Sequence, residues 1–586
     1  MMSLRRLPSA IILVALTGAG INPASVAAQN APRKLDRALQ AAVDGRSLQP
    51  QPVIVRARPG QIGLVRTWLK AHGDAIESEQ PALNALATKV TADHLRQLDA
   101  LLETETLSLN APVSGFAAPA SKPVAIEATV LRATLGLTSA SPTGKGIGVA
   151  IIDTGIQPSV DFEGRLAAFY DFVSAGGKFT SAYDDNGHGT HVAGLIGSSG
   201  ALGTAYTGVA PGARLIGMKV LDGQGLGKTS DVINAIMFAV ANKQLLGIDV
   251  INLSLGHPIY EAAATDPLVQ AVEAASRAGI IVVTASGNAG MNPVTGQPGY
   301  AGVTSPGNAP SAITAGAFDT KGTVGRGDDR VAPYSSAGPT WYDGQVKPDI
   351  VAPGHRLGSD AYRTQLLYKN YAALRLDSNH ITLSGTSMAA AVTAGAVAVL
   401  LDANRSANGY PARPSLTPNA AKAILQFTAI GMRDANGLEY DALREGAGAL
   451  NLGGAIDVAK AIDTSAPAGS WWLTSAVNTS TTIDGQDLAW SQNIVWGTNI
   501  VWGTSVFENE AAWAQNIVWG TNIVWGTNIV WGTNIVWGTN IVWGTNIVWG
   551  TGLVDTTNQQ NIVWGTLSAS NIVWGTNIVW SSLILQ

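Results

Sequence analysis

The chain has 586 residues, of which only 13% are charged, and its formal net charge is −5. This length allows several domains with buried cores, while the weakly acidic balance excludes the basic surface that nucleic-acid binding needs, so no nucleic acid is expected as a partner. Cysteine is absent, which excludes disulfides, thiolate metal sites and a cysteine nucleophile.

The first 28 residues have the pattern of a secretory signal peptide. Arg5 and Arg6 precede an apolar core, and small residues lead to a plausible cleavage point at Ala28. A membrane anchor would need about 18 or more apolar residues, but this core is shorter and is interrupted by Gly18 and Pro23. We therefore expect a secreted or cell-surface protein.

Residues 29–120 predict a small α+β unit that ends in a linker. The runs PVIVRARPGQ, NALATKVT and TLSLNAPV are strand-like. Helical spacing from Ile62 to Leu69 predicts one helix, and Thr91 is the expected N-cap of a second helix. The following stretch APVSGFAAPASKPV has the Pro/Ala composition of an exposed linker.

From Gly146 the pattern changes, and we assign one large domain to residues 121–464. The runs GVAIIDTG, ARLIGMKVL, IDVINLSLG and GIIVVTASGN are continuously apolar, and helical segments lie between them. Continuous apolar strands separated by helices indicate a mostly parallel sheet covered on both faces, a doubly wound α/β fold. In such sheets ligands bind at the carboxyl ends of the strands, so the polar residues that end these runs are the first candidates for chemistry.

Asp153 and His188 are two such candidates. Asp153 ends the run GVAIID, where a carboxylate at the rim of an apolar strand needs a partner; alone it could also be a turn residue. His188 lies in NGHGTHVAG, between glycines that allow close backbone approach. A two-histidine metal site is the competing interpretation of this motif, but the spacing and the glutamate of such helical pairs are missing.

Ser387 and Asn288 complete the set. Ser387 stands at the start of a long, nearly uncharged helix in SGTSMAAAVTAGAVAVLLDA, where helix N–H groups and the positive dipole end lie next to its hydroxyl. An ordinary N-cap serine is the plainer alternative. Asn288 closes GIIVVTASGN, where Gly-Asn alone would usually mean a turn. An Asp, a His and a Ser at strand and helix ends are the parts of a hydroxyl nucleophile activated by an oriented histidine.

These motifs resemble those of the subtilisin-like serine proteases, the subtilases of peptidase family S8. The likeness is carried by AIIDTGI, NGHGTHVAG, SGTSMAAA, VTASGN and KPDIVAPG, in the chain order Asp, His, Ser. It covers about residues 126–464 and implies a subtilisin-like fold. The small unit before it resembles the family's inhibitory propeptide, a ferredoxin-like α+β domain.

The resemblance implies a role for each catalytic residue. Ser387 would attack the scissile carbonyl, His188 would take and return the proton, and Asp153 would hold the imidazole. Asn288, with the N–H of Ser387, would bind the oxyanion. The chain is then a secreted serine endopeptidase that acts on proteins or peptides and needs no cofactor for its chemistry.

The resemblance also implies substrate-binding segments. One wall of the primary specificity pocket is expected at Ser254, Leu255 and Gly256, and the facing wall at Ala285, Ser286 and Gly287. LDGQGLG, with Gly223 and Gly225, resembles the edge that pairs with an extended peptide. The apolar Leu255 favours a broad or apolar preference for the residue before the scissile bond.

Metal binding is left unassigned. Asp184 and Asp185 beside the histidine motif could contribute to a structural Ca²⁺ site, since hard cations need clustered oxygens, but two acids are too few to define one. His355 and His380 lie in a segment that looks longer than in short family members, and we expect both histidines at the surface.

The propeptide is expected to occupy the active site of the precursor and to act as its intramolecular inhibitor. We predict self-cleavage between Val113 and Val124.

The C-terminal part is a linker, residues 465–492, followed by a repeat tail, residues 493–586. The tail contains ten full NIVWGT units and a shortened one, with insertions at 505–515, 552–560 and 567–570. Its composition and even period favour strands. Two arrangements remain open, a solenoid of stacked hexapeptides and a meander of four-residue strands joined by Gly-Thr turns.

The tail's function is also open. Surface attachment, polymer or carbohydrate binding, self-association and a passive stalk are all compatible with this uncharged, tryptophan-rich composition. For the whole chain, the rival hypothesis is an adhesion or structural protein that uses the subtilase domain as a scaffold.

Overall fold

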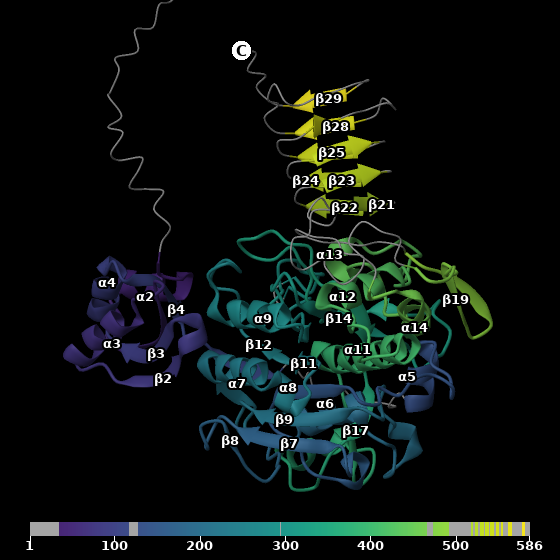
Figure 1. Ribbon diagram of the computed structural model, residues 1–586, viewed down its shortest axis with the longest axis horizontal. Coiled ribbons are helices and arrows are strands. Elements are labelled where there is room, and N and C mark those ends of the chain that lie inside the picture. The colour runs from purple at the N-terminus through teal and green to yellow at the C-terminus, as the bar shows by residue number, and fades with distance from the viewer. Residues whose placement is uncertain are drawn as a thin grey trace, which may run out of the picture.

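The structure is a computed structural model that describes residues 34–115, 127–292, 295–465 and 473–491, together with the backbone of short strands between 517 and 580. The predicted signal peptide lies outside the described residues. Figure 1 shows a small N-terminal unit beside a larger α/β domain.

The N-terminal unit is an α+β fold with one antiparallel sheet. Its elements are α2 (Arg37–Asp44), β1 (Gln51–Ala57), α3 (Ile62–Ala71), β2 (Ile76–Gln80), the 3-10 helix η1 (Pro81–Leu83), β3 (Ala85–Val90), α4 (Ala92–Ala100) and β4 (Thr104–Leu109). From β1 onward the order β-α-β-β-α-β and the sheet order β2-β3-β1-β4 are those of the ferredoxin-like fold. The predicted strands and helices are present, and Thr91 Oγ1 accepts a hydrogen bond from the N–H of His94.

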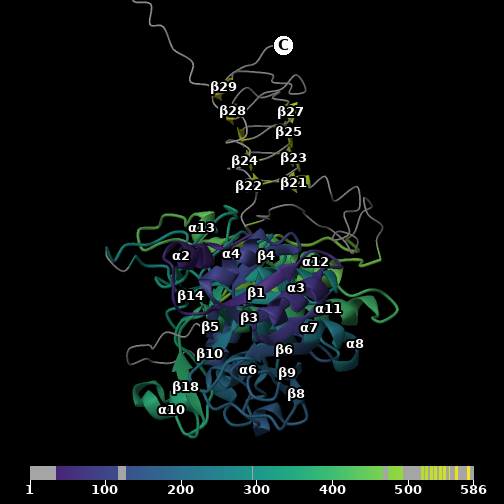
Figure 2. The ribbon, with the colours of Figure 1, turned by 90° about the vertical axis from the view of Figure 1, so that its left-hand side faces the viewer.

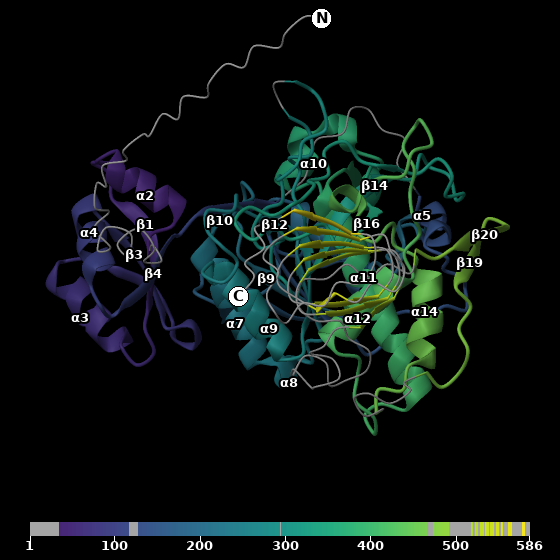
Figure 3. The same cartoon turned by 90° about the horizontal axis from the view of Figure 1, so that it is seen from above.

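The two faces of this small sheet pack differently. Val53 and Val55 of β1 lie in the core formed with α2, α3 and α4, whereas Ile54 between them joins a cluster that includes side chains of the large domain. The small unit therefore docks through its sheet, next to α7 and α9, as Figures 1 and 3 show.

The large domain is built on a nine-stranded sheet. Its strands are β6 (Gly148–Asp153), β7 (Leu166–Asp171), β8 (Lys178–Phe179), β9 (Arg214–Lys219), β11 (Val250–Leu253), β13 (Ile281–Ala285), β14 (Ile313–Asp319), β15 (Arg330–Val331) and β16 (Ile350–Pro353). The order is β15-β14-β13-β11-β6-β9-β7-β8, with β16 also paired to β14. Only the pairs that involve the short edge strands β8 and β15 are antiparallel, so the predicted mostly parallel sheet is confirmed.

Helices cover both faces of this sheet. The helical elements are α5 (Ala128–Thr134), η2 (Val160–Phe162), α6 (His188–Gly197), η3 (Thr204–Tyr206), α7 (Thr229–Ala241), α8 (Lys243–Leu246), α9 (Pro267–Arg277), α10 (Leu366–Asn370), η4 (Ala372–Leu374), α11 (Thr386–Asn408), α12 (Pro418–Phe427), α13 (Ala442–Glu445) and α14 (Leu452–Ala461). In β6, Val149 and Ile151 pack with α6, α11, α12 and α14, while Ala150 and Ile152 pack with α7 and α9. Both faces of the strand are buried, which explains its continuous apolar sequence.

Helix α11 is the central helix of the larger core. It is the one helix in the described part of the chain that is long and apolar enough to cross a membrane, and 94% of its most apolar window is buried inside the protein. We attribute its apolar sequence to this burial, and Ser387 is its second residue.

Two small sheets lie at the edge of the large domain. β5 (Pro112–Gly115) pairs antiparallel with β10 (Leu226–Lys228) on one side and with β12 (Leu255–Gly256) on the other. β17 (Leu357–Asp360) and β18 (His380–Leu383) form an antiparallel pair in the segment that the sequence marked as longer than usual.

The predicted linker is partly folded. β19 (Ser480–Ile483) and β20 (Gln486–Ala489) form a hairpin, and Trp490 is buried with its indole N–H donating to Thr481 Oγ1 at 2.8 Å. Thr481 Oγ1 also accepts from Asn451 Nδ2. Asn451 is the N-cap of α14, and its Oδ1 accepts from the N–H of Gly454. The folded domain therefore continues beyond residue 464, to at least residue 491.

The tail strands form two parallel sheets, which appear as two stacks in Figure 2. One contains β21 (Ile517–Trp519), β23 (Asn528–Trp531), β25 (Asn540–Trp543) and β27 (Leu553–Val554); the other contains β22 (Asn522–Trp525), β24 (Asn534–Trp537), β26 (Asn546–Trp549), β28 (Asn561–Trp564) and β29 (Asn577–Trp580).

Consecutive hexapeptides alternate between these two sheets, and identical residues stand opposite each other, such as Asn528 and Asn540. This parallel pairing is that of a solenoid, since a meander requires antiparallel neighbours. The insertion at 552–560 also takes part in this ladder, because Leu553 and Val554 pair with Ile541 and Val542.

Candidate active site

Asp153 and His188 form a buried ion pair at the carboxyl end of the sheet. Asp153 ends β6, and its Oδ1 accepts hydrogen bonds from His188 Nδ1 at 2.7 Å and from the N–H of Thr154 at 2.7 Å. Both side chains are buried. The bond to Nδ1 leaves His188 Nε2 as the nitrogen that can accept a proton, and Nε2 has no hydrogen-bond partner among the described residues.

The pKa of His188 reflects two opposing effects. Burial lowers it, but the charge of Asp153 and its hydrogen bond raise it more, so the pKa of His188 lies above its usual value of 6.5. The pair thus stabilises the imidazolium that forms when a histidine acts as a general base.

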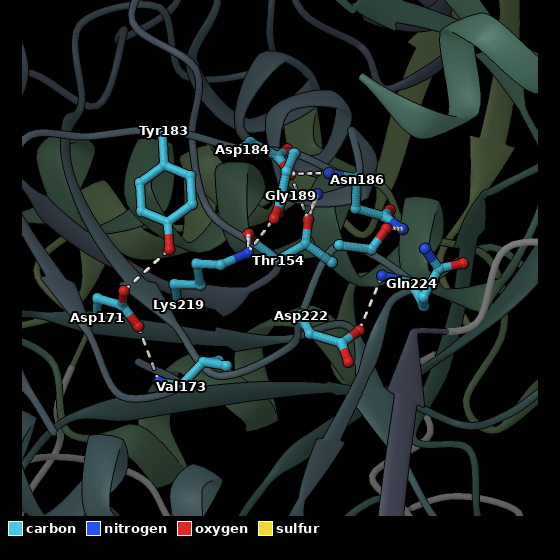
Figure 4. A network of polar contacts seen from close by, with 12 residues as sticks. Thr154, Asp171, Val173, Tyr183, Asp184, Asn186, Gly189, Lys219, Asp222 and Gln224 are labelled. Atoms are coloured by element: carbon cyan, nitrogen blue, oxygen red, sulfur yellow. Dashed lines mark hydrogen bonds and ion pairs between the residues drawn. The ribbon is translucent and has the colours of Figure 1, made fainter. Parts of the chain in front are cut away.

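A network of hydrogen bonds fixes the start of α6, the helix that carries His188 (Figure 4). Asp184 Oδ1 accepts from Thr154 Oγ1 and from the N–H groups of Asn186 and Gly187, while Oδ2 accepts from the N–H and hydroxyl of Thr190. Thr154 Oγ1 in turn accepts from Gly189 N–H. The buried Asp184 therefore ties the aspartate motif to the histidine helix.

These contacts argue against the suggested Ca²⁺ role of Asp184 and Asp185. Five donors already satisfy the two oxygens of Asp184, and Asp185 pairs with Lys219, whose ammonium lies 2.7 Å from Asp185 Oδ1 and 2.6 Å from the carbonyl of Thr154. A hard cation would compete with all these bonds. Lys219 was not predicted, because a lysine within the strand motif ARLIGMKVL carries no signal of its partner.

Ser387 lies at the N-terminal end of α11, next to β12. Its Oγ donates to the carbonyl oxygen of Ser254 at 3.0 Å, and Ser254 Oγ donates back to the carbonyl of Ser387 at 2.9 Å. This reciprocal pair joins the serine motif to the expected wall of the specificity pocket. Catalytic hydrogen bonds between a nucleophile and its base often tighten only when substrate binds.

Asn288 is oriented by Thr386, a residue that the sequence analysis did not single out. Asn288 Oδ1 accepts from the N–H and from the hydroxyl of Thr386, both at 3.0 Å, and Thr386 Oγ1 accepts from Gly287 N–H at 3.2 Å. Because the amide oxygen is held on this side, Nδ2 is the donor end of the Asn288 amide. The motif SGTSMAAA contains Thr386, but it does not show that the Thr386 hydroxyl donates to Asn288.

The expected pocket walls are neighbouring segments. Leu255 and Gly256 form β12, and Ala285 ends β13, followed by Ser286 and Gly287. Leu255, Ala285 and Ser286 are fully buried. Gly287 has a φ of 106°, and a Cβ there would lie 3.0 Å from Ser336 Oγ, so this wall requires glycine.

The edge strand differs from the expectation at Gly223 and Gly225. The residues that pair with β5 are Leu226, Gly227 and Lys228, which follow the two glycines. Gly223 instead accepts a hydrogen bond from Asn186 Nδ2 through its carbonyl oxygen. The glycine-rich motif marked the turn correctly, but the pairing register could not be read from it.

Strand β5 brings the N-terminal unit close to His188. Gly115, the last residue of β5, pairs with Leu255 and lies so close to His188 that a Cβ would stand 3.1 Å from the imidazole. Val113 of β5, which pairs with Gly227 of β10, is fully buried. The stretch that follows, where cleavage was predicted, lies outside the described residues.

Three other histidines of the domain, His191, His355 and His380, differ in burial. His191, the second histidine of the motif, is buried, and burial lowers its pKa to about 3, so it is neutral and contacts the carbonyl of Leu357 at 3.1 Å. His355 is half-buried, but His380 is only 1% exposed. The expectation that His380 lies at the surface is therefore wrong.

The family model of the Subtilase family matches residues 144–492. That range covers more than half of the chain, and the chain belongs to this family, whose members are serine endopeptidases. The match extends to the hairpin that the structure places on α14.

Known relatives agree with this assignment. The chain is 41% identical over 315 residues to serine protease AprX from Bacillus subtilis, which covers 53% of this chain and 66% of that protein, just under two thirds. It is 31% identical over 356 residues to a subtilisin from a Bacillus strain, with 59% of this chain and 77% of that protein covered. Among solved structures, fervidolysin from Fervidobacterium pennivorans, described as a keratinolytic enzyme related to subtilisin, superposes with a TM-score of 0.54 at 22% identity, covering 70% of this chain and 62% of that one.

Proposed function

We propose that this chain is a secreted serine endopeptidase in which Ser387, His188 and Asp153 act as a catalytic triad. One observation carries the proposal furthest. The extended strand β5 lies between the edges β10 and β12 and ends against the imidazole of His188. A groove that holds a peptide backbone in this way beside a buried Asp-His pair and a helix-end serine suits peptide hydrolysis.

The proposed reaction follows from the positions of these groups. Ser387 Oγ attacks the scissile carbonyl carbon while His188 Nε2 takes the hydroxyl proton, and Asp153 Oδ1 holds the imidazolium through Nδ1–H. Asn288 Nδ2 and the N–H of Ser387 donate to the oxyanion. His188 then protonates the leaving amine, and water hydrolyses the acyl-enzyme by the reverse sequence of proton transfers.

The pocket walls support a broad or apolar preference at the residue before the scissile bond. Leu255 and Ala285 are apolar and buried, and no charged residue belongs to either wall segment. An apolar pocket discriminates weakly between side chains that differ by single methylene groups.

The N-terminal unit is proposed as the intramolecular inhibitor. Its attachment is polar as well as apolar: Asn110 exchanges hydrogen bonds with Ser230 at the start of α7, and the carbonyl of Ala111 accepts from the N–H and hydroxyl of Thr229. These contacts hold the chain immediately before β5. A cleavage product bound in this manner blocks the groove.

The register of β5 supports a position for the proposed self-cleavage. Gly115 is opposite Leu255, so the next residue of an antiparallel pair would be opposite Ser254, whose backbone carbonyl accepts the hydrogen bond from Ser387. We therefore propose cleavage of the bond between Phe116 and Ala117, within the range predicted from the sequence. Phe116 is apolar, which agrees with the proposed preference for an apolar residue before the scissile bond.

Ser387→Ala in the full chain tests both proposals. We expect the parent to lose its N-terminal unit with a new N-terminus at Ala117, read by intact mass and N-terminal sequencing, and the variant to remain a single uncleaved chain. Ser406→Ala, an exposed serine later in the same helix, is the matched control and should process like the parent. Equal processing of Ser387→Ala and the parent would disprove self-cleavage, and retained peptidase activity would disprove the nucleophile.

Two further roles are proposed, export of the protein and attachment through the tail. Export rests on the N-terminal sequence. The tail is proposed to attach the enzyme to a cell surface or polymer or to associate with itself. The alternative, an adhesion protein with an inert subtilase scaffold, is disfavoured by the complete set of catalytic residues.

A further inference from the structure

Asp161, Asp360 and His380 form a buried cluster that the proposed reaction does not use. They come from three separate elements: η2, the last residue of β17 and the first residue of β18. Asp360 and His380 stand opposite each other in the β17–β18 ladder. One side-chain ligand atom from each of the three residues lies within 4.8 Å of the other two, and all three residues are buried.

Asp377 and Tyr206 hold the ring of His380 in place. His380 Nδ1 lies 2.8 Å from the carboxylate of Asp377, and its ring stacks on Tyr206 with a centroid distance of 3.8 Å. Its other nitrogen, Nε2, is buried and has no hydrogen-bond partner among the described residues. A carboxylate on one ring nitrogen and a free lone pair on the other is the arrangement found around metal-binding histidines.

The carboxylate of Asp360 lies beside that of Asp161 in this cluster. The side chain is fully buried, and neither carboxylate oxygen has a hydrogen-bond partner in the described part of the chain. Space for it is provided by Gly194 of α6, where a Cβ would lie 2.2 Å from Asp360 Oδ2. By contrast, Asp161 Oδ1 accepts from Ser199 Oγ and from backbone N–H groups, while the contact to Oδ2 is a longer one of 3.3 Å from Leu202 N–H.

Two adjacent buried carboxylates require a positive charge or a shared proton. A divalent cation would satisfy the oxygens of Asp360 and the lone pair of His380 at once, which a shared proton cannot do for Nε2. Calcium takes six to eight oxygen ligands, whereas one imidazole nitrogen with carboxylate oxygens is a donor set typical of Zn²⁺.

We propose that Asp161, Asp360 and His380 bind a divalent cation of the Zn²⁺ class, with Asp377 holding the histidine in the binding orientation. The proposal concerns a structural site and does not depend on the proposed peptidase activity.

The position of the site indicates what the cation would stabilise. Ser359 Oγ, next to Asp360, donates to the carbonyl of His191 at 2.8 Å, and His191 contacts Leu357 of the same strand. His191 belongs to α6, which begins at His188. A cation held by η2, β17 and β18 would therefore fix this strand pair against the helix that carries the catalytic base.

The test uses the full chain with Ser387→Ala, so that self-digestion cannot occur. The protein is stripped with a chelator and titrated with Zn²⁺, Co²⁺ and Ca²⁺, with calorimetry, the visible absorption of Co²⁺ and the thermal midpoint as readouts. His380→Asn removes Nε2 and keeps an amide near the Nδ1 position, and Asp360→Asn removes one carboxylate. His355→Asn, another histidine of the same domain outside the cluster, is the matched control.

We expect one equivalent of Zn²⁺ or Co²⁺ to bind, a Co²⁺ absorption band, a higher thermal midpoint and little response to Ca²⁺. His380→Asn and Asp360→Asn should weaken affinity by at least about tenfold, and His355→Asn should match the parent. The proposal is overturned if the stripped parent binds no equivalent of Zn²⁺ or Co²⁺, or if His380→Asn binds either ion as tightly as the parent. If either variant does not fold, the stoichiometry and Co²⁺ spectrum of the parent decide alone.

Discussion

At the residue scale, Thr386 shows how a side chain outside the triad can set the geometry of the oxyanion site. It holds the oxygen of Asn288 and accepts from the N–H of Gly287, so one hydroxyl joins the oxyanion donor to the pocket wall. Subtilase motifs identify Asn288, but only the structure shows what orients its amide.

Thr386→Val is predicted to lower kcat about tenfold, because it removes one of the two hydrogen bonds that hold the Asn288 oxygen, a change of about 1.4 kcal/mol in the transition state. Thr386→Ser keeps the hydroxyl and should restore most of the activity. Steady-state kinetics on a peptide substrate separate kcat from KM. Unchanged kcat in Thr386→Val would show that the Thr386 hydroxyl does not position Asn288.

The acid side of the pH profile is predicted from His188. Its pKa is raised above 6.5 by Asp153, despite the opposing effect of burial, and only the neutral imidazole accepts a proton. The value of kcat/KM should therefore fall as the pH drops through a midpoint above 6.5. In Asp153→Asn the midpoint should move to lower pH and the rate should fall by about 10⁴. A midpoint that does not move in this variant would contradict the assigned pair.

At the element scale, the long apolar strands were predictable and the short polar ones were not. β6, β9, β11 and β13 are buried on both faces, so their sequences are continuously apolar. β2 reads IESEQ and lies at the edge of the small sheet, where polar residues are tolerated. Its pairing with β3 places it in the sheet, and a polar edge strand of this kind lacks the apolar pattern that predicts a strand.

Contacts between segments far apart in sequence limit the prediction of the site. Asp153, His188, Ser387 and Asn288 were found because each motif is local. The pairing edge Leu226–Lys228, the Lys219–Asp185 pair and the burial of His380 depend on segments far apart in sequence. Residues 465–492 were predicted to be a linker because they are small and polar, although the buried Trp490 packs against the domain.

The segment KPDIVAPG contributes a buried carboxylate, Asp349, that is shared by Lys347 of the same segment and Lys422 of α12. Asp349 pairs with Lys347 and Lys422, each at 2.8 Å, and all three side chains are buried. Asp349→Asn is predicted to lower the free energy of unfolding by about 3–5 kcal/mol, because it leaves buried lysines without a counterion. Urea unfolding in the Ser387→Ala background measures this.

Glu439→Gln is the control for that prediction, since the Arg433–Glu439 pair is largely exposed and such pairs contribute about 0–1 kcal/mol. If Asp349→Asn were no more destabilising than Glu439→Gln, the buried ion cluster would not be important for stability.

At the scale of the whole molecule, the catalytic domain and the repeat tail are predicted to be separable. Deleting residues 493–586 should leave kcat/KM for a small peptide within about twofold of the parent, because Asp153, His188 and Ser387 all belong to elements of the folded domain that precedes the tail. Retention on cells or polymers should be lost. Loss of peptide hydrolysis would refute the separation.

In contrast to deletion of the tail, Trp490→Ala should affect the stability of the catalytic domain. It removes a buried indole from the hairpin that packs on α14 and should lower the free energy of unfolding by about 3–5 kcal/mol.

The central claim, that Ser387 is a nucleophile activated by His188, is tested most directly by covalent labelling. A fluorophosphonate should react with the processed enzyme at one serine, located at Ser387 by peptide mass spectrometry, and His188→Ala should slow the reaction by at least about a hundredfold. Labelling at another serine, or an equal rate in His188→Ala, would contradict the account.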